Sequence, residues 1–131
     1  MVIDTSAIIA VLFDEEERDV FVDILIVEPV LVISAAAFHE ASVVNARKRR
    51  DGGTAQVDGF LTEFGVEVAA FGYEDVRVAR EAYLQFGKGN HPARLNLIDC
   101  CSYALAKSRN EPLLFKGSAF AKTDIAPAWL P

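Results

Sequence analysis

The sequence predicts an α/β fold, a three-layer α/β/α sandwich with a mainly parallel central sheet. Two observations predict it. Short apolar runs alternate along the chain with helical patterns of about 10–15 residues, which is typical of a parallel sheet with helices on both faces. The 131 residues are 52% hydrophobic and 24% charged. This is a globular composition at the size of one domain, so we expect residues 1–131 to form a single domain.

The predicted elements follow in chain order. We expect strands at the short apolar runs, residues 1–4, 29–33, 66–71 and 112–115, with a last short strand near Ile125. We expect helices where apolar residues recur every three to four positions, at residues 6–13, 14–26, 34–49, 54–63, 74–85 and 96–108. The acidic run 14–17 is expected to open the second helix, because negative charge suits a helix N-terminus. Asp51, Gly52 and Gly53 are expected to break the chain before the fourth helix.

Charge and cysteine content exclude several classes of function. The chain has 13 basic and 19 acidic residues, a formal net charge of −6. This net charge argues against nucleic-acid binding through the overall charge of the protein, but it leaves open a local basic rim around an acidic, metal-filled site. Cys100 and Cys101 are adjacent, which suits neither a loop-closing disulfide nor a spaced zinc pair. No basic segment precedes the first apolar run, and charges interrupt the longest one, so we expect a soluble cytoplasmic protein without a membrane span.

Carboxylates stand in unusual places in this pattern. Asp4 ends the first predicted strand, where functional groups gather in parallel sheets, although it would also cap the following helix. Glu40 lies in an apolar helical stripe, where an ionised group is costly to bury without a positive partner; a partly exposed edge is the alternative. Asp99 lies in an apolar first helical turn, which the helix dipole also favours. Asp124, in a predicted loop, is a fourth candidate.

Carboxylates gathered at one place need a cation, because like charges a few ångströms apart destabilise the fold. Mg²⁺ or Mn²⁺ takes oxygen ligands from a few carboxylates and keeps several waters. Such an ion polarises a phosphoryl oxygen and generates hydroxide near neutral pH. No histidine or cysteine spacing in the sequence resembles a zinc site. We therefore expect a site for a hard divalent cation.

Four sequence blocks, spread over nearly the whole chain, carry a family resemblance. They are Met1 to Ala7; Ser34 to Glu40; Tyr83 to His91 with Leu95, Asn96, Asp99 and Cys100; and Leu113 to Gly117 with Phe120 and Thr123 to Ile125. In this order and spacing they resemble the PIN-domain ribonucleases, and specifically the VapC toxins of bacterial type II toxin–antitoxin pairs. The predicted fold is then PIN-like.

The resemblance implies an activity, a metal and partners. Asp4, Glu40 and Asp99 would form the catalytic acidic triad, with Asp4 and Asp99 as direct ligands of Mg²⁺ or Mn²⁺. The implied reaction is phosphodiester cleavage in RNA by a metal-dependent endoribonuclease. The implied partner is a cognate antitoxin, encoded beside the toxin, that inhibits the enzyme.

The chain departs from the family pattern at Ser118 and Ala119. Close relatives commonly carry acidic residues there, after the Phe-Lys-Gly block. The departure predicts one ordered metal, with Asp124 as an additional acidic residue. It also favours the main alternative, a PIN-fold protein that binds antitoxin or RNA without cleaving. An aspartyl-phosphate phosphatase is disfavoured, because Ser6 stands where that chemistry usually needs a second aspartate.

Two kinds of surface are expected to contact partners. Lys88, His91 and Arg94 precede the third carboxylate and Lys116 follows the last strand, so we expect them to contact RNA phosphates. The basic run 47–50 is interpreted as a solvated helix end. The first two helices carry more apolar residues than one small core needs. This predicts a surface for an antitoxin helix, a homodimer partner, or both.

Overall fold

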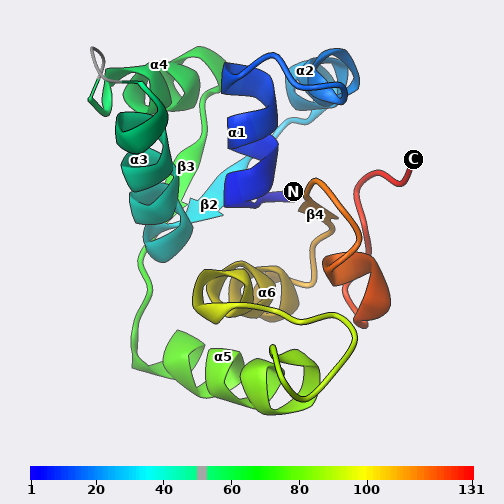
Figure 1. The fold of residues 1–131 in the computed structure, drawn as a ribbon. Helices are drawn as coiled ribbons and strands as arrows, with labels where there is room; N and C mark the ends of the chain where they lie inside the picture. The colour runs from blue at the N-terminus through cyan, green and yellow to red at the C-terminus, as the bar shows by residue number, and fades with distance from the viewer. Residues whose placement is uncertain (50–52) are drawn as a thin grey trace.

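Four parallel strands form the centre of the part of the chain that the computed structural model describes, residues 1–49 and 53–131. The sheet order is β3–β2–β1–β4. The strands are β1 Val2–Ile3, β2 Val32–Ser34, β3 Glu67–Ala69 and β4 Leu113–Leu114. The helices are α1 Thr5–Leu12, α2 Arg18–Val27, α3 Ala35–Lys48, α4 Ala55–Phe64, α5 Tyr73–Phe86, α6 Leu97–Arg109 and the short 3₁₀ helix η1 Phe120–Lys122 (Figure 1).

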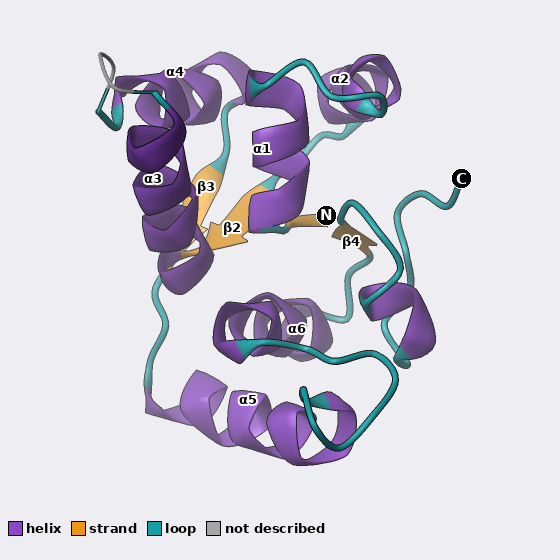
Figure 2. Ribbon diagram, in the orientation of Figure 1, coloured by secondary structure: helices purple, strands orange, loops and turns teal. Residues whose placement is uncertain are grey.

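Two apolar cores lie on opposite faces of this sheet. Successive residues of a strand point to opposite faces. Accordingly, Val2 and Val32 pack into a core shared with α5 and α6, whereas Ile3 and Ile33 pack into a core shared with α1, α2, α3 and α4. Figure 2 shows α5 and α6 together on one side of the strands and α1, α2, α3 and α4 on the opposite side. The predicted three-layer α/β/α sandwich with a parallel sheet is confirmed.

The strand ends lead directly into helices, and this positions the site. Asp4 follows β1 and is the N-cap of α1, and Ser34 ends β2 and caps α3. Asn96 caps α6 through its side chain. Each cap accepts an otherwise unpaired backbone N–H, so the sequence itself fixes where these helices begin. Three helix starts therefore converge near the carboxyl end of the sheet.

Two expectations about the elements are wrong. The acidic run 14–17 does not open a helix, because α2 begins at Arg18 and Asp14 has a left-handed backbone with φ of 55°. The run forms the link between α1 and α2. Near Ile125, the described residues contain only an isolated bridge between Leu113 and Pro127 instead of a strand. Of the expected chain break, Asp51 and Gly52 lie outside the described residues. No helix in the described ranges is long and apolar enough to cross a membrane.

Candidate active site

The first carboxylate, Asp4, lies at the carboxyl end of β1 and is only 3% exposed. Three donors hold its two oxygens. The backbone N–H and the hydroxyl of Ser6 donate to Oδ2 at 2.9 and 2.6 Å. The hydroxyl of Ser102, from α6, donates to Oδ1 at 2.7 Å. Both interpretations of Asp4 therefore hold, since it caps a helix and also presents a buried carboxylate at a strand end.

Glu40 reaches the same place from α3. Its Oε2 lies 3.1 Å from the hydroxyl of Thr5, the residue that follows Asp4, and it shares the single proton of that hydroxyl with the carbonyl of Ala37 at 3.0 Å. Burial raises the pKa of Glu40 above its ordinary value; the hydrogen bond from Thr5 opposes the rise, and the charge of Asp4 adds to it. The glutamate is therefore partly desolvated beside a second carboxylate.

Asp99 is the third member, in the first turn of α6. It forms a capping box with Asn96, whose backbone N–H donates to Asp99 Oδ2 at 2.7 Å. Burial raises the pKa of Asp99 to about 6; the Asn96 N–H opposes the rise, while the charges of Asp4 and Glu40 add to it. The structure thus brings together three carboxylates that are far apart in the sequence. We call Asp4, Glu40 and Asp99 the acidic cluster.

The acidic cluster carries no compensating charge within residues 1–49 and 53–131. None of the ion pairs in these ranges joins Asp4, Glu40 or Asp99 to a lysine or arginine. Mutual repulsion and a set of oxygen donors suit a hard divalent cation. In the same ranges, no three acidic, imidazole or thiol groups are close enough to hold a metal as they stand. The donor chemistry therefore fits an ion held by two carboxylates and waters, which is common for Mg²⁺.

The structure does not bring Asp124 to the acidic cluster. The hydroxyl of Tyr103 donates to its Oδ1 at 2.7 Å, and the ammonium of Lys107 bonds its Oδ2 at 2.6 Å. Lys107, with help from Tyr103, holds the pKa of Asp124 below its ordinary value. Asp124 also lines a small hollow with Pro112, at the amino end of β4. Asp124 is thus not available as an additional acid of the metal site, because Lys107 already neutralises its charge.

Lys116 lies near the acidic cluster, but its ammonium is engaged elsewhere. Its backbone N–H donates to the hydroxyl of Ser6 at 3.0 Å. Its Nζ pairs with Glu15 at 2.9 Å and with Glu17 at 2.7 Å, both in the link between α1 and α2. A phosphate contact by Lys116 would require these two ion pairs to open.

The other predicted phosphate-binding residues share one loop. Lys88, His91 and Arg94 line a single open hollow of about 400 Å³, formed by the loop that joins α5 to α6. The loop is shaped locally, since the backbone N–H of Ala93 donates to His91 Nδ1 at 3.1 Å. In the basic run at the end of α3, Lys48 and Arg49 lie over the ring of Phe13, and Arg50 is outside the described residues.

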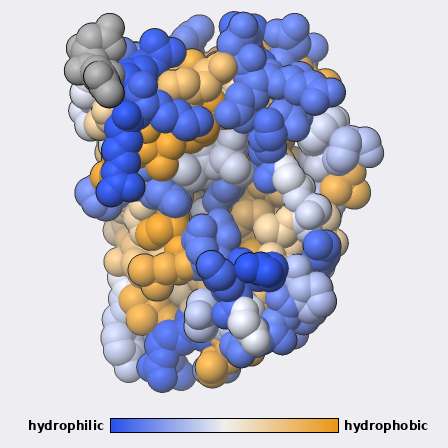
Figure 3. Space-filling model, viewed as in Figure 1, coloured by the Kyte–Doolittle hydropathy of each residue, from blue (hydrophilic) through white to orange (hydrophobic). Residues whose placement is uncertain are grey.

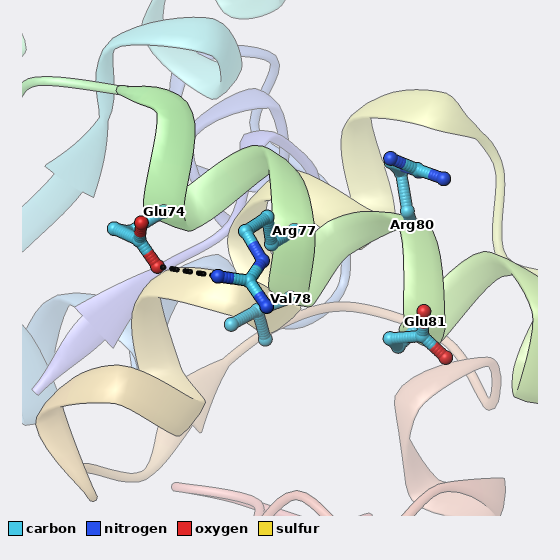
Figure 4. A pocket seen from close by; sticks show the side chains of 5 residues that line it. All are labelled: Glu74, Arg77, Val78, Arg80 and Glu81. Atoms are coloured by element: carbon cyan, nitrogen blue, oxygen red, sulfur yellow. Dashed lines mark ion pairs between the residues drawn. The ribbon is translucent and has the colours of Figure 1, made fainter.

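A larger hollow on α5 is chemically different from the acidic cluster. It measures about 600 Å³ and is lined by Glu74, Arg77, Val78, Arg80 and Glu81. Figure 4 shows that these side chains come from one helix and that Arg77 pairs with Glu74, at 3.6 Å. Its acids are accompanied by arginines, so it lacks the uncompensated negative charge of the cluster.

Sequence reasoning missed the neutral donors that hold the cluster. Thr5 and Ser6 stand beside Asp4, and their role could have been suspected from that position. Ser102 lies three residues after Asp99, the spacing that puts two side chains on one face of a helix. Of the unusual block at Ser118 and Ala119, the serine is exposed and the alanine packs against the core beneath α6.

Comparison with curated proteins identifies the family. Residues 1–126 match the PIN domain family. The chain is 41% identical to "Ribonuclease VapC" of Mycolicibacterium smegmatis over 126 residues, which cover 96% of this chain and 98% of that protein. It is 42% identical to "Ribonuclease VapC42" of Mycobacterium tuberculosis over 129 residues, or 98% of each chain.

Solved structures with little sequence similarity share the fold. VapC20 of Mycobacterium tuberculosis, described as a Sarcin–Ricin loop cleaving toxin, superposes with a TM-score of 0.75 at 17% identity and 95% coverage of both chains. VapBC2 of Rickettsia felis, bound to a promoter DNA fragment, gives a TM-score of 0.72 at 14% identity, with 96% of this chain and 94% of that chain covered. By the family match and the 41% and 42% identities to curated ribonucleases, the chain belongs to the PIN domain family and, within it, to the VapC ribonucleases.

Proposed function

We propose that residues 1–131 form a single PIN-like domain that acts as an Mg²⁺- or Mn²⁺-dependent endoribonuclease, the toxin of a type II toxin–antitoxin pair. The observation that carries the proposal is the acidic cluster, in which burial, with the charges of neighbouring carboxylates adding to it, raises the pKa values of Asp99 and Glu40. Membership among the VapC ribonucleases gives the reaction class. A cytoplasmic location belongs to the same proposal, because that is where RNA and an antitoxin would be met.

Each member of the cluster has a distinct task in this proposal. Asp4 and Asp99 hold the cation, which when bound supplies Lewis-acid polarisation of the phosphoryl oxygen and a more acidic water. Glu40 uses only Oε2 to accept from Thr5, which leaves Oε1 to accept a proton from the attacking water. Its raised pKa makes it a stronger base than an exposed glutamate. The loop of Lys88, His91 and Arg94 would position the RNA backbone.

The antitoxin surface proposed here lies between α1, α2 and α4. A hollow of about 570 Å³ there is lined by apolar side chains, among them Val22, Phe60 and Phe64, with Arg18 and Glu63 among its charged lining residues. A groove lined by both apolar and charged side chains suits an amphipathic helix. Several apolar residues of the first two helices are core, such as the fully buried Ile8 and Phe21, whereas Ile26 and Val27 of α2 are 68% and 78% exposed. The predicted apolar excess is therefore core in part, and Phe64→Glu in this groove should weaken binding of the purified antitoxin encoded beside the toxin.

The proposed homodimer uses the opposite side of the molecule. A hollow of about 480 Å³ between α5 and α6 is almost entirely apolar, and Leu84 and Leu97 beside it are 66% and 76% exposed. Figure 3 shows apolar surface gathered over this part of the molecule. Helix α5 carries charges of both signs, with acids at 74, 75 and 81 and arginines at 77 and 80, so a second copy of α5 in the opposite direction can pair acids with arginines. Light scattering should give a dimer that Leu84→Glu converts to a monomer.

The experiment that tests the activity is cleavage of a single-stranded RNA by the purified chain. Cleavage should require added Mn²⁺ or Mg²⁺, stop with EDTA, and disappear in Asp99→Asn. The matched control is Asp124→Asn, the same change at an acid that Lys107 already neutralises. If the wild-type chain binds RNA or antitoxin and does not cleave, the chain is a binding protein and the proposed activity is wrong. If Asp99→Asn cleaves normally, the site assignment is wrong.

A further inference from the structure

Ser102 is a fully buried polar residue of α6, with an exposed fraction of 0%. It lies one helical turn after Asp99, so both side chains face the acidic cluster. Its hydroxyl donates to Oδ1 of Asp4 at 2.7 Å, across 98 residues of sequence. The bond joins the helix that carries one member of the cluster to the strand end that carries another.

The hydrogen bond of Ser102 differs from those of two hydroxyls in the interiors of α3 and α4. A serine or threonine inside a helix commonly bonds back to the carbonyl four residues earlier. Ser42 in α3 does so with the carbonyl of Phe38 at 2.9 Å, and Thr62 in α4 does so with Asp58 at 3.0 Å. Ser102 has a single proton and directs it to Asp4 instead. Its bond is thus specific to the carboxylate and not a general property of a buried helical hydroxyl.

The partners of Asp4 leave few of its lone pairs free. A carboxylate offers about four acceptor positions. On Oδ2, two are used by the N–H and the hydroxyl of Ser6. On Oδ1, Ser102 uses one acceptor position. The other acceptor position of Oδ1 remains, and its direction is set by the carboxylate plane, which the three hydrogen bonds hold. Hydrogen bonds to a ligating carboxylate orient it, and their loss typically lowers metal affinity or activity by about 10–100-fold.

We propose that Ser102 is a positioning residue, whose buried hydroxyl orients Oδ1 of Asp4 for the divalent cation. This inference rests on the proposed metal-dependent function. Without Ser102, rotation of the Asp4 carboxylate is limited only at Oδ2, and the cation meets a less ordered ligand. The consequence is weaker metal binding first, and slower cleavage because of it.

The test measures Mn²⁺ affinity by calorimetry on Ser102→Ala, with Ser42→Ala as the matched control. Both changes remove a buried helical hydroxyl, but only one removes a bond to Asp4. We expect Mn²⁺ binding to weaken by about 10–100-fold in Ser102→Ala and less than twofold in Ser42→Ala. At sub-saturating Mn²⁺, kcat should fall while KM for RNA changes less than twofold. Adding Ser102→Ala to Asp4→Asn should weaken Mn²⁺ binding no further.

The outcomes separate this inference from the proposed function. If the wild-type chain binds no Mn²⁺ and does not cleave, the proposed function fails and the inference fails with it. If the wild type binds Mn²⁺ and Ser102→Ala binds it equally well, only the role of Ser102 is wrong. Equal losses in Ser102→Ala and Ser42→Ala also overturn it, because they indicate a general loss of packing. If Ser102→Ala does not fold, Ser102→Cys, a weak donor of similar size, is judged by the same criterion.

Discussion

Two aspartates, one in α6 and one that contacts it, illustrate opposite ways of accommodating a carboxylate. Asp99, in the first turn, has burial and two neighbouring carboxylates around it, which raise its pKa to about 6. Asp124 contacts the same helix further along, where Lys107 and Tyr103 hold its pKa below the ordinary value. Both were candidates for one metal site. The difference teaches that the partner of a carboxylate, and not its presence in a family block, separates a candidate metal-binding acid from a structural one.

The two sites differ in the source of the positive charge that neutralises the carboxylate. Lys107 neutralises Asp124 from within the chain, so that pair ties the C-terminal segment to α6. The acidic cluster has no such pair among the described residues, so its repulsion can be relieved only by protons or by an added cation. A protein retains such a costly arrangement at functional sites. Four experiments test this contrast.

The largest expected effect follows from removing a carboxylate that we propose to hold the metal. Asp4→Asn should reduce cleavage to background and weaken Mn²⁺ binding by more than the roughly 10–100-fold that is typical of losing a hydrogen-bond partner of a ligand. Asp124→Asn should leave both quantities unchanged. Calorimetry and RNA cleavage on the two variants check this, and a loss of Mn²⁺ binding in Asp124→Asn would remove the distinction between the two sites.

Glu40→Gln should have the next largest effect. If Glu40 accepts a proton from the attacking water, turnover should fall by roughly 10²–10⁴-fold, the usual range for general acid–base catalysis. Metal affinity should fall less than in Asp4→Asn, because Glu40 is not a direct ligand in this proposal. A larger loss of affinity in Glu40→Gln than in Asp4→Asn would mean that the roles of the two residues are exchanged.

The third prediction concerns the stability of the metal-free protein between about pH 4 and 6. The folded pKa of Asp99, about 6, lies above its unfolded value of 3.8. The folded state therefore binds the proton of Asp99 more tightly than the unfolded state does. The stability that this proton contributes is lost as pH rises through this window. At pH 7, Asp99→Asn should be more stable than wild type by about 1–2 kcal/mol, and the difference should vanish near pH 4. Urea unfolding at several pH values measures it; saturating Mn²⁺ should reverse the order at pH 7.

The smallest effect is expected at the other aspartate, with the opposite sign. The lowered pKa of Asp124 gives stability that is present above its unfolded pKa and is lost as pH falls through the folded one. Its pair with Lys107 is about half exposed, so Asp124→Asn should destabilise the fold by at most about 1 kcal/mol at pH 7. Thermal melts of the same variants check this, and a stabilised Asp124→Asn would contradict the comparison.

The sequence by itself determined the architecture and most of the acidic cluster. The alternation of strand and helix periods predicted the parallel sheet, since these periods act within a few residues. Asp4 and Asp99 were identifiable because each stands in an apolar run at the start of a helix. Glu40 was identifiable because a charge interrupted an apolar stripe. In each case the signal is local, a residue that conflicts with its immediate neighbours.

Only the tertiary structure decided which charges meet. Lys116, which the sequence predicts as a phosphate contact, pairs with Glu15, 101 residues earlier. Glu15 belongs to the acidic run 14–17, which links two helices instead of starting one. Asp124, a candidate metal ligand in the sequence, forms an ion pair with Lys107. Ser102 donates to Asp4, 98 residues earlier in the sequence. Such pairings depend on distances set by the packing of the whole chain, because an electrostatic or hydrogen-bonding group acts on whatever the fold brings near it, regardless of sequence separation.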